Sequence, residues 1–542
     1  MRHVSVLVVG AGPVGLTAAA ALRRRGVDVR IVDRLKARLP FAKAVGIQPR
    51  TLEIWDLMGC VRPVLDAAEP LRGQLAYVDG VEQARIRLAL PPELPYGFAA
   101  LPQYETERVL EEHLGGFGTR VERGAELVAF EQDEEGVTAR LAWARAGGGA
   151  TEEEVRCRYL VGCDGAHSTV RKGLGLAFEG GAFPESYLLG DVRVDWDLPA
   201  GYALRAMHRG ADGAIDDVLV AVPLPGHGRY RVSATVPPEL APADPADGVA
   251  HGPEGGRAPA LGDIQAVLDR LSPQPATASY LRWSSVFRIS HRLVDRYGEG
   301  RVFVAGDAAH IHPPTGAQGM NTGIQDAWNL AWKLALAVEG GARAGLLASY
   351  DAERRPVGAE VVGRTVRHAA EGVQADRTDP ETLLLREAQL LVTYRGSPVV
   401  GPADASAGGG PEPGDRAPDC GGLAGDLAAY PLRLYDLLRG RGHVLLLYGD
   451  GRSAAELHRL AYAAGLLSRG RVESCAVLAH GGAPIGGTGL PVYRDARGEF
   501  AQRYAVRVPT AFLVRPDGHL GARFTALGVG TLADRLAAVF RR

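Results

Sequence analysis

The fold is indicated first by residues 4–33, which read VSVLVVGAGPVGLTAAAALRRRGVDVRIVD. The apolar run Val4–Val9 predicts a strand, and the alanine-rich segment Leu16–Arg25, which ends at Gly26, predicts a helix. Val27–Val32 predicts a second strand. A strand, a helix and a strand of these lengths form a βαβ unit, so we expect an α/β fold that begins with a parallel, Rossmann-like sheet.

The turn between the first strand and the helix has the spacing of a dinucleotide site. Gly10 permits the tight turn, Gly12 lets the backbone approach a pyrophosphate, and Gly15 allows close contact between helix and strand. The phosphates would lie at the helix N-terminus. Asp33 ends the second strand and can accept hydrogen bonds from a ribose hydroxyl. The predicted dinucleotide site therefore comprises Gly10, Gly12, Val14, Gly15, Asp33 and Arg34.

The composition limits the kinds of protein to consider. The 542 residues exceed the roughly 250–300 at which a single core stops growing, so we expect two or three domains. A net charge of −2 provides no basic surface for nucleic acid or an anionic membrane, and we expect neither as a partner. Glycines interrupt the first apolar run, which argues against a signal peptide. Five scattered cysteines without a C-x-x-C pair argue against disulfides and zinc, so we expect a cytoplasmic chain without a metal site.

The pattern of apolar residues changes along the chain. Alternating segments at Tyr187–Trp196, Val218–Pro223, Arg229–Val236 and Ser279–Ile289 predict a mainly antiparallel sheet, and the interval Pro237–Gly262 predicts a surface loop. Val302–Ala305 and Met320–Val338 then predict a strand and a helix of the first architecture. We therefore expect a first domain at residues 1–175 and 291–395, an inserted sheet domain at 176–290, a linker at 396–413 and a third domain at 414–542.

Two acidic turns follow later predicted strands. Tyr159–Gly162 leads into Cys163-Asp164-Gly165, and Arg301–Ala305 leads into Gly306-Asp307. Short acids at strand ends suit sugar hydroxyls, because an ionised carboxylate only accepts hydrogen bonds and a sugar can donate them. Together with the glycine turn, these motifs resemble the class A flavoprotein monooxygenases, the para-hydroxybenzoate hydroxylase and phenol hydroxylase superfamily. The resemblance covers roughly residues 1–390.

The resemblance implies that the cofactor is FAD. It implies that Asp307 binds the ribityl chain, and that Asp164 helps to hold both the pyrophosphate and a nicotinamide nucleotide. The alternative for Asp164 is an N-cap of the helix that begins near Ser168. In the family a loop and helix start lie along the flavin ring, where backbone N–H groups meet its N1/O2 edge and stabilise the anionic reduced flavin. The corresponding residues here are Pro314, Gly319, Met320 and Asn321.

Four further positions concern the cofactor site, and the first three match the family or depart from it. Gln103 corresponds to a glutamine that contacts FAD. Lys43 stands where relatives usually have arginine. An ammonium can contact a phosphate, but it cannot donate two parallel hydrogen bonds as a guanidinium does. Ala317 stands where relatives usually have glycine, and its methyl group is expected to alter the mobility of the loop. Leu127 is predicted to flank the adenine, with packing in the core as the alternative.

The resemblance also implies the reaction. NADPH or NADH would reduce the flavin, O2 would add at C4a, and the resulting hydroperoxide would transfer oxygen to an electron-rich ring of a phenol or an aromatic polyketide. The sequence contains no Ser/His/Asp triad or H-E-x-x-H motif, so no catalytic side chain is assigned, and His310 is expected to be structural. The substrate would lie between the flavin and the inserted sheet, where Tyr230, Trp283 and Phe287 are candidates for its wall or for the core.

The last part of the chain resembles a thioredoxin-like domain. His443–Tyr448 predicts a buried strand, Val508-Pro509-Thr510 resembles the cis-proline motif, and Pro516-Asp517-Gly518 predicts a hairpin turn. Gly449–Ser453 stands where a redox Cys-x-x-Cys is expected, so the domain should be redox-silent. An appended domain of this kind is typical of phenol hydroxylase and of the bacterial aromatic polyketide hydroxylases of antibiotic pathways, and the domain order favours the latter.

Other functions are compatible with the same motifs. A Baeyer–Villiger monooxygenase and an antibiotic-inactivating hydroxylase would share the scaffold, because substrate placement and not the motifs decides between these reactions. A flavin-binding partner without catalysis is a third alternative. The sequence is compatible with a monomer or a homodimer.

Overall fold

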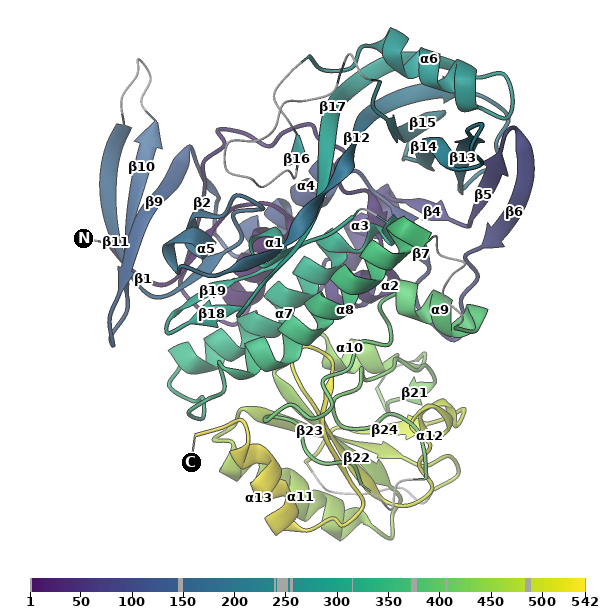
Figure 1. Cartoon of the computed structure of the whole chain (residues 1–542). Coiled ribbons are helices and arrows are strands. Elements are labelled where there is room, and N and C mark those ends of the chain that lie inside the picture. The colour runs from purple at the N-terminus through teal and green to yellow at the C-terminus, as the bar shows by residue number, and fades with distance from the viewer. Residues whose placement is uncertain are drawn as a thin grey trace.

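The computed structural model describes residues 2–144, 150–237, 240, 252–253, 257–313, 315–371, 378–404, 408–427, 429–482 and 489–541. Within these residues the chain is a mixed α/β protein with several sheets, as the sequence predicts. Helices α7 (Gly319–Val338) and α8 (Ser349–Glu371) cross the middle of the molecule. Figure 1 shows the first sheet and the inserted sheet above these helices and the C-terminal part, in yellow-green, below them.

The first sheet contains the predicted βαβ unit. β1 (Arg2–Val9) pairs in parallel with β2 (Val29–Asp33) and with β11 (Ala150–Gly162), and β11 pairs in parallel with β19 (Val302–Val304). The order is β18-β19-β11-β1-β2-β8. The carboxyl ends of β1, β2, β11 and β19 therefore meet at one edge of the sheet. The remaining strands are β8 (Glu122–Arg123), β9 (Ala125–Gln132), β10 (Val137–Ala144) and β18 (Gly298–Glu299).

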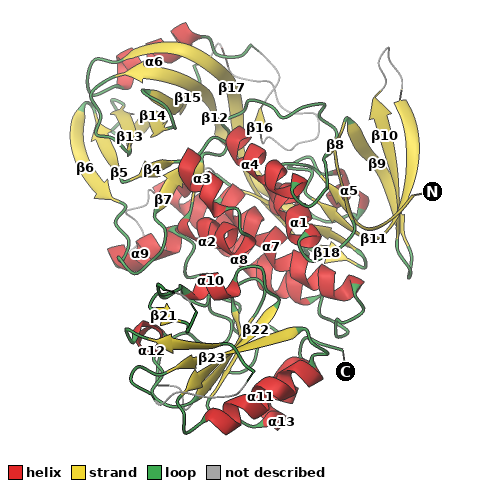
Figure 2. Cartoon of the chain, turned by 180° about the vertical axis from the view of Figure 1, so that it is seen from behind, coloured by secondary structure: helices red, strands yellow, loops and turns green. Residues whose placement is uncertain are grey.

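A layer of helices covers this sheet (Figure 2). α1 (Pro13–Arg23) begins at Pro13 rather than at the predicted Leu16, because the fixed φ of proline suits the first helical turn. Its buried alanines are small, which lets α7 pack closely against it. Trp328, Trp332 and Leu334 of α7 are buried in apolar clusters, as predicted. The other helices of this part are α2 (Pro49–Met58), α3 (Val61–Ala67), α4 (Gln103–Gly115), α5 (Thr169–Gly173) and α9 (Pro380–Glu387).

The second sheet has the order β16-β17-β12-β15-β14-β13-β5-β6. Two of its strands, β5 (Gly73–Val78) and β6 (Val81–Arg87), precede residue 176, so the sheet extends beyond the predicted range. β5 pairs in parallel with β13 and satisfies backbone groups that would otherwise form an open edge. α6 (Leu261–Leu271) covers one face of the sheet. The other strands are β12 (Phe178–Asp195), β13 (Tyr202–Arg209), β14 (Ile215–Pro223), β15 (Arg229–Thr235), β16 (Gly252–Pro253) and β17 (Thr277–Val294).

The predicted surface loop 237–262 lies largely outside the described residues. Three short strands form a small separate sheet, in which β7 (Phe98–Ala100) lies between β3 (Gly46–Ile47) and β4 (Glu69–Leu71). Another short strand, β20 (His310–Ile311), pairs with β17 and links the Gly-Asp turn to the second sheet. No described helix is long and apolar enough to span a membrane.

The C-terminal part has its own six-stranded sheet of order β21-β24-β23-β22-β25-β26. β22 (His443–Gly449) and β23 (Val472–Leu478) are parallel, and α11 (Ala454–Leu467) connects them. β25 (Thr510–Val514) and β26 (Leu520–Phe524) form the predicted hairpin. The other elements are β21 (Leu423–Ala424), β24 (Val492–Asp495), α10 (Leu434–Leu438), α12 (Glu499–Arg503) and α13 (Val529–Ala537).

One feature predicted for the C-terminal part is wrong. The described residues contain no cis peptide bond, so the bond between Val508 and Pro509 is trans and the resemblance to a cis-proline motif does not extend to its geometry. The trans form is the more stable isomer of an X-Pro bond by about 0.5–1 kcal/mol, and it persists where no neighbouring structure enforces the alternative.

Candidate functional site

The glycine turn lies at the carboxyl edge of the first sheet and is packed against the turn that follows β11. Gly10 has a φ of +99°, and a Cβ atom placed there would lie 2.3 Å from the carbonyl oxygen of Cys163. A Cβ atom at Gly15 would lie 1.9 Å from the carbonyl oxygen of Gly10. Both positions therefore require glycine for steric reasons. Gly12 has no atom within 4 Å of its Cβ position, so the turn leaves space on the side where a ligand would approach.

Asp33 reaches back to the same turn from the end of β2. Its carboxylate accepts hydrogen bonds from the backbone N–H of Ala11 at 2.7 Å and of Leu35 at 2.8 Å. Arg34 is exposed beside it. The predicted βαβ site is therefore brought together in space, although Asp33 also has a structural part in holding the turn.

The Gly-Asp turn after β19 packs directly on the glycine turn. Gly306 has a φ of +61°, and a Cβ atom there would lie 2.9 Å from the Cγ2 atom of Val14. The carboxylate of Asp307 is 38% exposed and lies 3.7 Å from the Nζ atom of Lys43. The same ammonium lies 5.3 Å from the ring centroid of Phe287 on β17. Lys43 thus links the Gly-Asp turn electrostatically to the second sheet.

The loop before α7 is held by a set of buried amides. Ala317 has a φ of 55°, a backbone conformation that favours glycine, and its methyl group faces Gly46 of β3. The Asn321 side chain donates to the carbonyl oxygens of Gly46 and Ala317, and its Oδ1 atom accepts from the N–H of Gln48 and the hydroxyl of Thr51. The loop before α7 and the segment around β3 are therefore tied together. Pro314 lies outside the described residues.

The carboxylate of Asp164 is used within the protein. It accepts hydrogen bonds from the hydroxyl of Ser168 at 2.6 Å and from the backbone N–H of Val170 at 3.1 Å. Ser168 in turn caps α5 by accepting from the N–H of Arg171. Burial raises the pKa of Asp164, and these hydrogen bonds oppose that shift. The geometry favours the capping role over a direct contact with a ligand.

Gln103 and Glu107 form a buried pair on α4. The side-chain amide of Gln103 donates to Glu107 at 2.9 Å, and its oxygen accepts from the N–H of Ala44 at 3.2 Å. Burial raises the pKa of Glu107 to about 7. Leu127 is buried in the main apolar cluster and pairs with Leu141 across β9 and β10, so it lies in the core.

The two histidines that flank the Gly-Asp turn have different surroundings. His310 is buried, and its Nε2 atom lies 2.8 Å from the carboxylate of Asp326, which also contacts Arg354; this agrees with the structural role predicted for it. His312 donates from Nδ1 to the carbonyl oxygen of Pro313 at 2.8 Å, because a carbonyl can only accept. Burial lowers the pKa of His312 to about 4, so the ring is neutral at pH 7 and Nε2 is an acceptor beside Gly319.

A cavity of about 2000 Å³ connects these turns to the second sheet. Eight of the predicted residues line it, namely Gly12, Val14, Lys43, Gln103, Phe287, Asp307, Gly319 and Met320. The sheet contributes alternate residues of its strands, as side chains of period two require. They include Tyr187 and Leu189 of β12, Arg205 of β13, Val220 of β14, and Arg231 and Ser233 of β15.

Two of the three aromatic wall residues predicted from the sequence do not line this cavity. Tyr230 is adjacent to Arg231 in β15, so its side chain faces the other side of the sheet. There its ring lies 4.9 Å from that of Trp196. Trp283 packs on Phe41 in an adjacent apolar cluster, with ring centroids 5.1 Å apart. The prediction missed Arg231, although the alternation Arg231, Ser233, Thr235 within one strand could have indicated a polar face.

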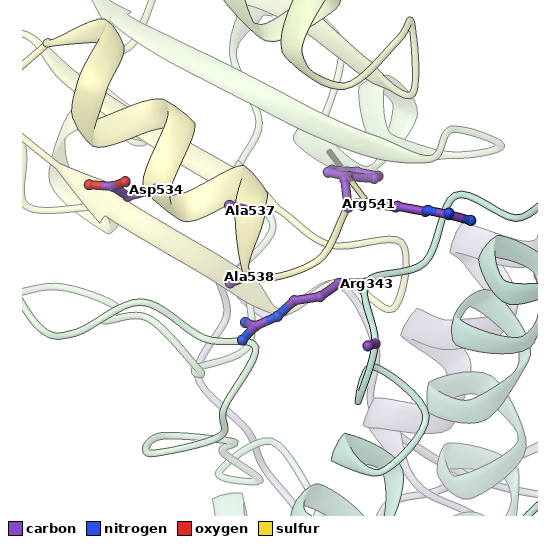
Figure 3. A pocket seen from close by; sticks show the side chains of 7 residues that line it. Arg343, Asp534, Ala537, Ala538 and Arg541 are labelled. Atoms are coloured by element: carbon purple, nitrogen blue, oxygen red, sulfur yellow. The ribbon is translucent and has the colours of Figure 1, made fainter.

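A second, smaller cavity of about 440 Å³ lies between the segment after α7 and the end of the chain. Figure 3 shows Arg343 from the segment after α7 beside Ala537 and Ala538 at the end of α13. None of the residues predicted for the cofactor or the substrate lines it.

The large cavity fits FAD. Glycine positions open toward it at Gly12, an exposed carboxylate lies at Asp307, and the first turn of α7 borders it at Gly319 and Met320. These are the groups that a pyrophosphate, a polyol chain and a flavin ring edge respectively require. The side chain of Asn321 forms its hydrogen bonds within the protein and holds the start of α7 in place.

Comparison with known proteins agrees with this geometry. Residues 3–365 match the model of the FAD binding domain family. The chain is 34% identical to the 6-methylpretetramide 4-monooxygenase of Streptomyces rimosus over 98% of this chain and 93% of that protein. It is 36% identical to a flavin-dependent monooxygenase of Mycobacteroides abscessus over 82% of this chain and 88% of that protein.

A solved structure shares the whole architecture. The flavin-dependent monooxygenase PieE, determined in complex with FAD and substrate, is 26% identical and covers 99% of both chains with a TM-score of 0.79. The chain therefore belongs to the FAD-binding family of aromatic and polyketide monooxygenases that these relatives represent.

Proposed function

We propose that this chain is an FAD-dependent aromatic hydroxylase that uses NADPH or NADH together with O2 and acts on a phenolic or polyketide substrate. The observation that carries the proposal is the continuity of the large cavity. It joins the glycine turn, Asp307 and the start of α7 to the inner face of the second sheet, so a flavin and an aromatic substrate can lie in one continuous space.

In this proposal the residues of the protein bind and orient the cofactor. FAD, when bound, supplies the redox and oxygen-transfer chemistry. The N-terminus of α1 and Gly12 would hold the pyrophosphate, and Asp307 would accept hydrogen bonds from the ribityl hydroxyls. The backbone N–H groups at Gly319 and Met320 would hold the N1/O2 edge of the flavin ring. Asp33, Arg34 and Gln103 serve the adenosine side. Lys43 holds the carboxylate of Asp307 in place and can turn to a phosphate.

Three further assignments belong to the proposal. Asp164 acts as a positioning residue, because its carboxylate fixes the turn at Gly165, which borders the cavity. His312 offers a neutral acceptor next to Gly319 and cannot act as an acid near pH 7. Phe287 forms an apolar wall beside Lys43. Together with its apolar neighbours Leu189 and Val222, Phe287 would exclude water from the reacting ring.

The C-terminal part is proposed to be a thioredoxin-like domain without redox function. The order β23-β22-β25-β26, with α11 between the parallel strands and α13 after the hairpin, supports this assignment. Gly449–Ser453 provides no cysteine at the end of β22. We propose domain limits of 1–175 with 291–395, 176–290, 396–413 and 414–542, with β5 and β6 joining the sheet of the second domain.

The test uses purified protein and two variants of Asp307. We expect Asp307→Ala to lose most of its flavin absorbance per protein, and Asp307→Asn to retain part of it, because an amide oxygen still accepts from a hydroxyl. Since Asp307 is partly exposed, neither change should unfold the chain, which circular dichroism checks. Full FAD occupancy in Asp307→Ala would contradict the assignment.

The products formed during turnover distinguish the possible reactions. We expect a phenolic or polyketide ligand to stimulate NADPH oxidation and to gain one oxygen atom on an intact ring, as mass and NMR spectra of the product would show. A ring-expanded lactone of the same mass would instead identify a Baeyer–Villiger enzyme. Absence of stimulation by every such ligand would favour a flavin-binding partner without catalysis.

A further inference from the structure

Arg231 is a buried cation without a partner in the described part of the chain. The residue is 9% exposed, it forms no hydrogen bond or ion pair with the described residues, and its Nε atom is buried and unsatisfied. Burial alone lowers its pKa to about 10. A buried, unpaired guanidinium is less stable than one in water, so the fold retains this charge at the expense of its stability.

The carboxylates around the cavity do not neutralise Arg231. Asp191 lies opposite Arg231 on β12, but both of its oxygens accept from Arg229 at 2.6 Å. Among the cavity-lining acids, Glu93, Asp216, Asp307 and Glu387 contact Arg503, His208, Lys43 and Arg364 respectively, and Glu381 lies on α9 and not on the sheet. A second arginine, Arg205 of β13, also lines the cavity and forms no hydrogen bond or ion pair with a described residue. The inner face of the sheet therefore carries uncompensated positive charge.

We propose that Arg231, assisted by Arg205, anchors a planar anion with two oxygen atoms on the aromatic substrate. A guanidinium donates two parallel hydrogen bonds to such a group, and both a carboxylate and an enolised β-dicarbonyl have this geometry. The inference deepens the proposed function and rests on it, because it concerns the cavity in which the substrate would lie.

The register of the strands defines how long the substrate must be. Arg231 pairs with Asp191, and Phe287 pairs with Tyr187 four residues along the same strand. Because β12 lies between β15 and β17, two strand spacings and four residues separate Arg231 from Phe287, which is on the order of 15 Å. A single ring held at Arg231 would not reach the wall at Phe287 and Lys43. The structure therefore selects a substrate of several fused rings with its acidic group at one end.

The experiment measures binding to the FAD-loaded protein by calorimetry with two anthraquinones. Rhein carries a carboxylate, and aloe-emodin carries a hydroxymethyl group at the same position. We expect the wild type to bind rhein at least about tenfold more tightly. Arg231→Met should remove this preference and leave the affinity for aloe-emodin unchanged, and Arg231→Lys should keep part of it, because an ammonium lacks the fork. Arg209→Met is the control, since Arg209 is exposed at the end of β13 and does not line the cavity.

A second readout is independent of ligands. Replacing an unpaired buried charge with an apolar side chain of similar length should raise the midpoint of thermal unfolding, so Arg231→Met should be more heat-stable than the wild type without ligand. Displacement of rhein by triacetylmethane, an acidic β-triketone without a carboxylate, would show that the same site also accepts enolates.

The outcomes separate this inference from the proposed function. Equal affinity of the wild type for both anthraquinones, or a preference that persists in Arg231→Met, would overturn the anion site even if the protein hydroxylates a substrate. A preference that depends on Arg231 in a protein that never couples NADPH oxidation to any ligand would support the anion site and overturn the hydroxylase.

Discussion

At the scale of single residues, Glu107 is the clearest pH-sensitive group near the predicted adenosine side of the site. It is 8% exposed, and burial raises its pKa from 4.5 to about 7 although Gln103 donates to it. The unfolded chain releases this proton at lower pH than the folded chain does. The contribution of Glu107 to the free energy of unfolding therefore falls as pH rises from about 4.5 to about 7, and it is constant above that range.

We expect Glu107→Gln to remove this pH dependence. Its free energy of unfolding should equal that of the wild type near pH 4.5 and exceed it by up to about 3 kcal/mol above pH 7, since one pKa unit corresponds to about 1.4 kcal/mol. Chemical denaturation at several pH values measures the difference. Two curves that stay parallel from pH 4.5 to 8 would contradict the buried, protonated state of Glu107.

At the scale of elements, the loop before α7 and strand β3 are fitted to each other. Gly46 faces Ala317, and a Cβ atom at position 46 would lie 2.5 Å from the Cβ atom of Ala317. The alanine at 317, in place of the glycine usual in the resembled family, is thus accommodated by a glycine at 46. Asn321 reinforces the same junction by donating to the carbonyl oxygens of both residues.

This fit predicts a non-additive pair of substitutions. Gly46→Ala should lower the free energy of unfolding by about 1–3 kcal/mol, as overpacking of a core does. Ala317→Gly alone should change it by less than about 1 kcal/mol, because relief of the positive φ opposes the greater freedom of glycine in the unfolded chain. The double variant should recover most of the loss, and denaturation of all four proteins completes the cycle. Simple additivity of the two changes would show that the two elements do not meet as described.

At the scale of the whole molecule, the C-terminal domain is attached to the FAD-binding part by buried charges. The side chain of Arg515, at the end of β25, donates to both oxygens of Glu353 on α8 at 2.7 and 2.8 Å. Lys333 of α7 contacts the same carboxylate at 2.7 Å. Asp517 of the hairpin turn accepts from Asn329 and Trp332 of α7. The helix whose N-terminus borders the cofactor site therefore rests on the C-terminal hairpin.

Removing one charged member of this network should lower the free energy of unfolding. We expect Arg515→Met to lower the free energy of unfolding by about 3–5 kcal/mol, because Glu353 and Asp517 would lose a buried cation. Thermal unfolding gives the change, and limited proteolysis should cut the C-terminal domain faster. The matched control is Arg85→Met, whose ion pair with Glu82 is exposed and should have no measurable effect. An unchanged midpoint for Arg515→Met would show that this network does not hold the two parts of the chain together, and that the other contacts between them, such as the ion pair of Arg416 with Glu53, are sufficient.

The sequence by itself determined the local units of this protein. The βαβ unit, the two acidic turns, α7 and the hairpin at Pro516–Gly518 follow from residue patterns that act over a few positions, namely periodicity, glycine conformation and turn chemistry. The same patterns placed Gly12, Val14, Asp307, Gly319 and Met320, which the fold brings to one cavity.

Only the tertiary structure decided which side chains face that cavity and which partners they have. Tyr230 turns away because a shift of one residue moves a side chain to the other face of a sheet, and the register of β15 depends on its pairing with strands from residues 187–193 and 219–223. Asp164 is committed to Ser168 and Val170, while Arg231 has no partner among the described residues, and neither fact is visible in a linear sequence. Local propensity fixes an element, but burial and charge pairing depend on residues that are distant in the chain.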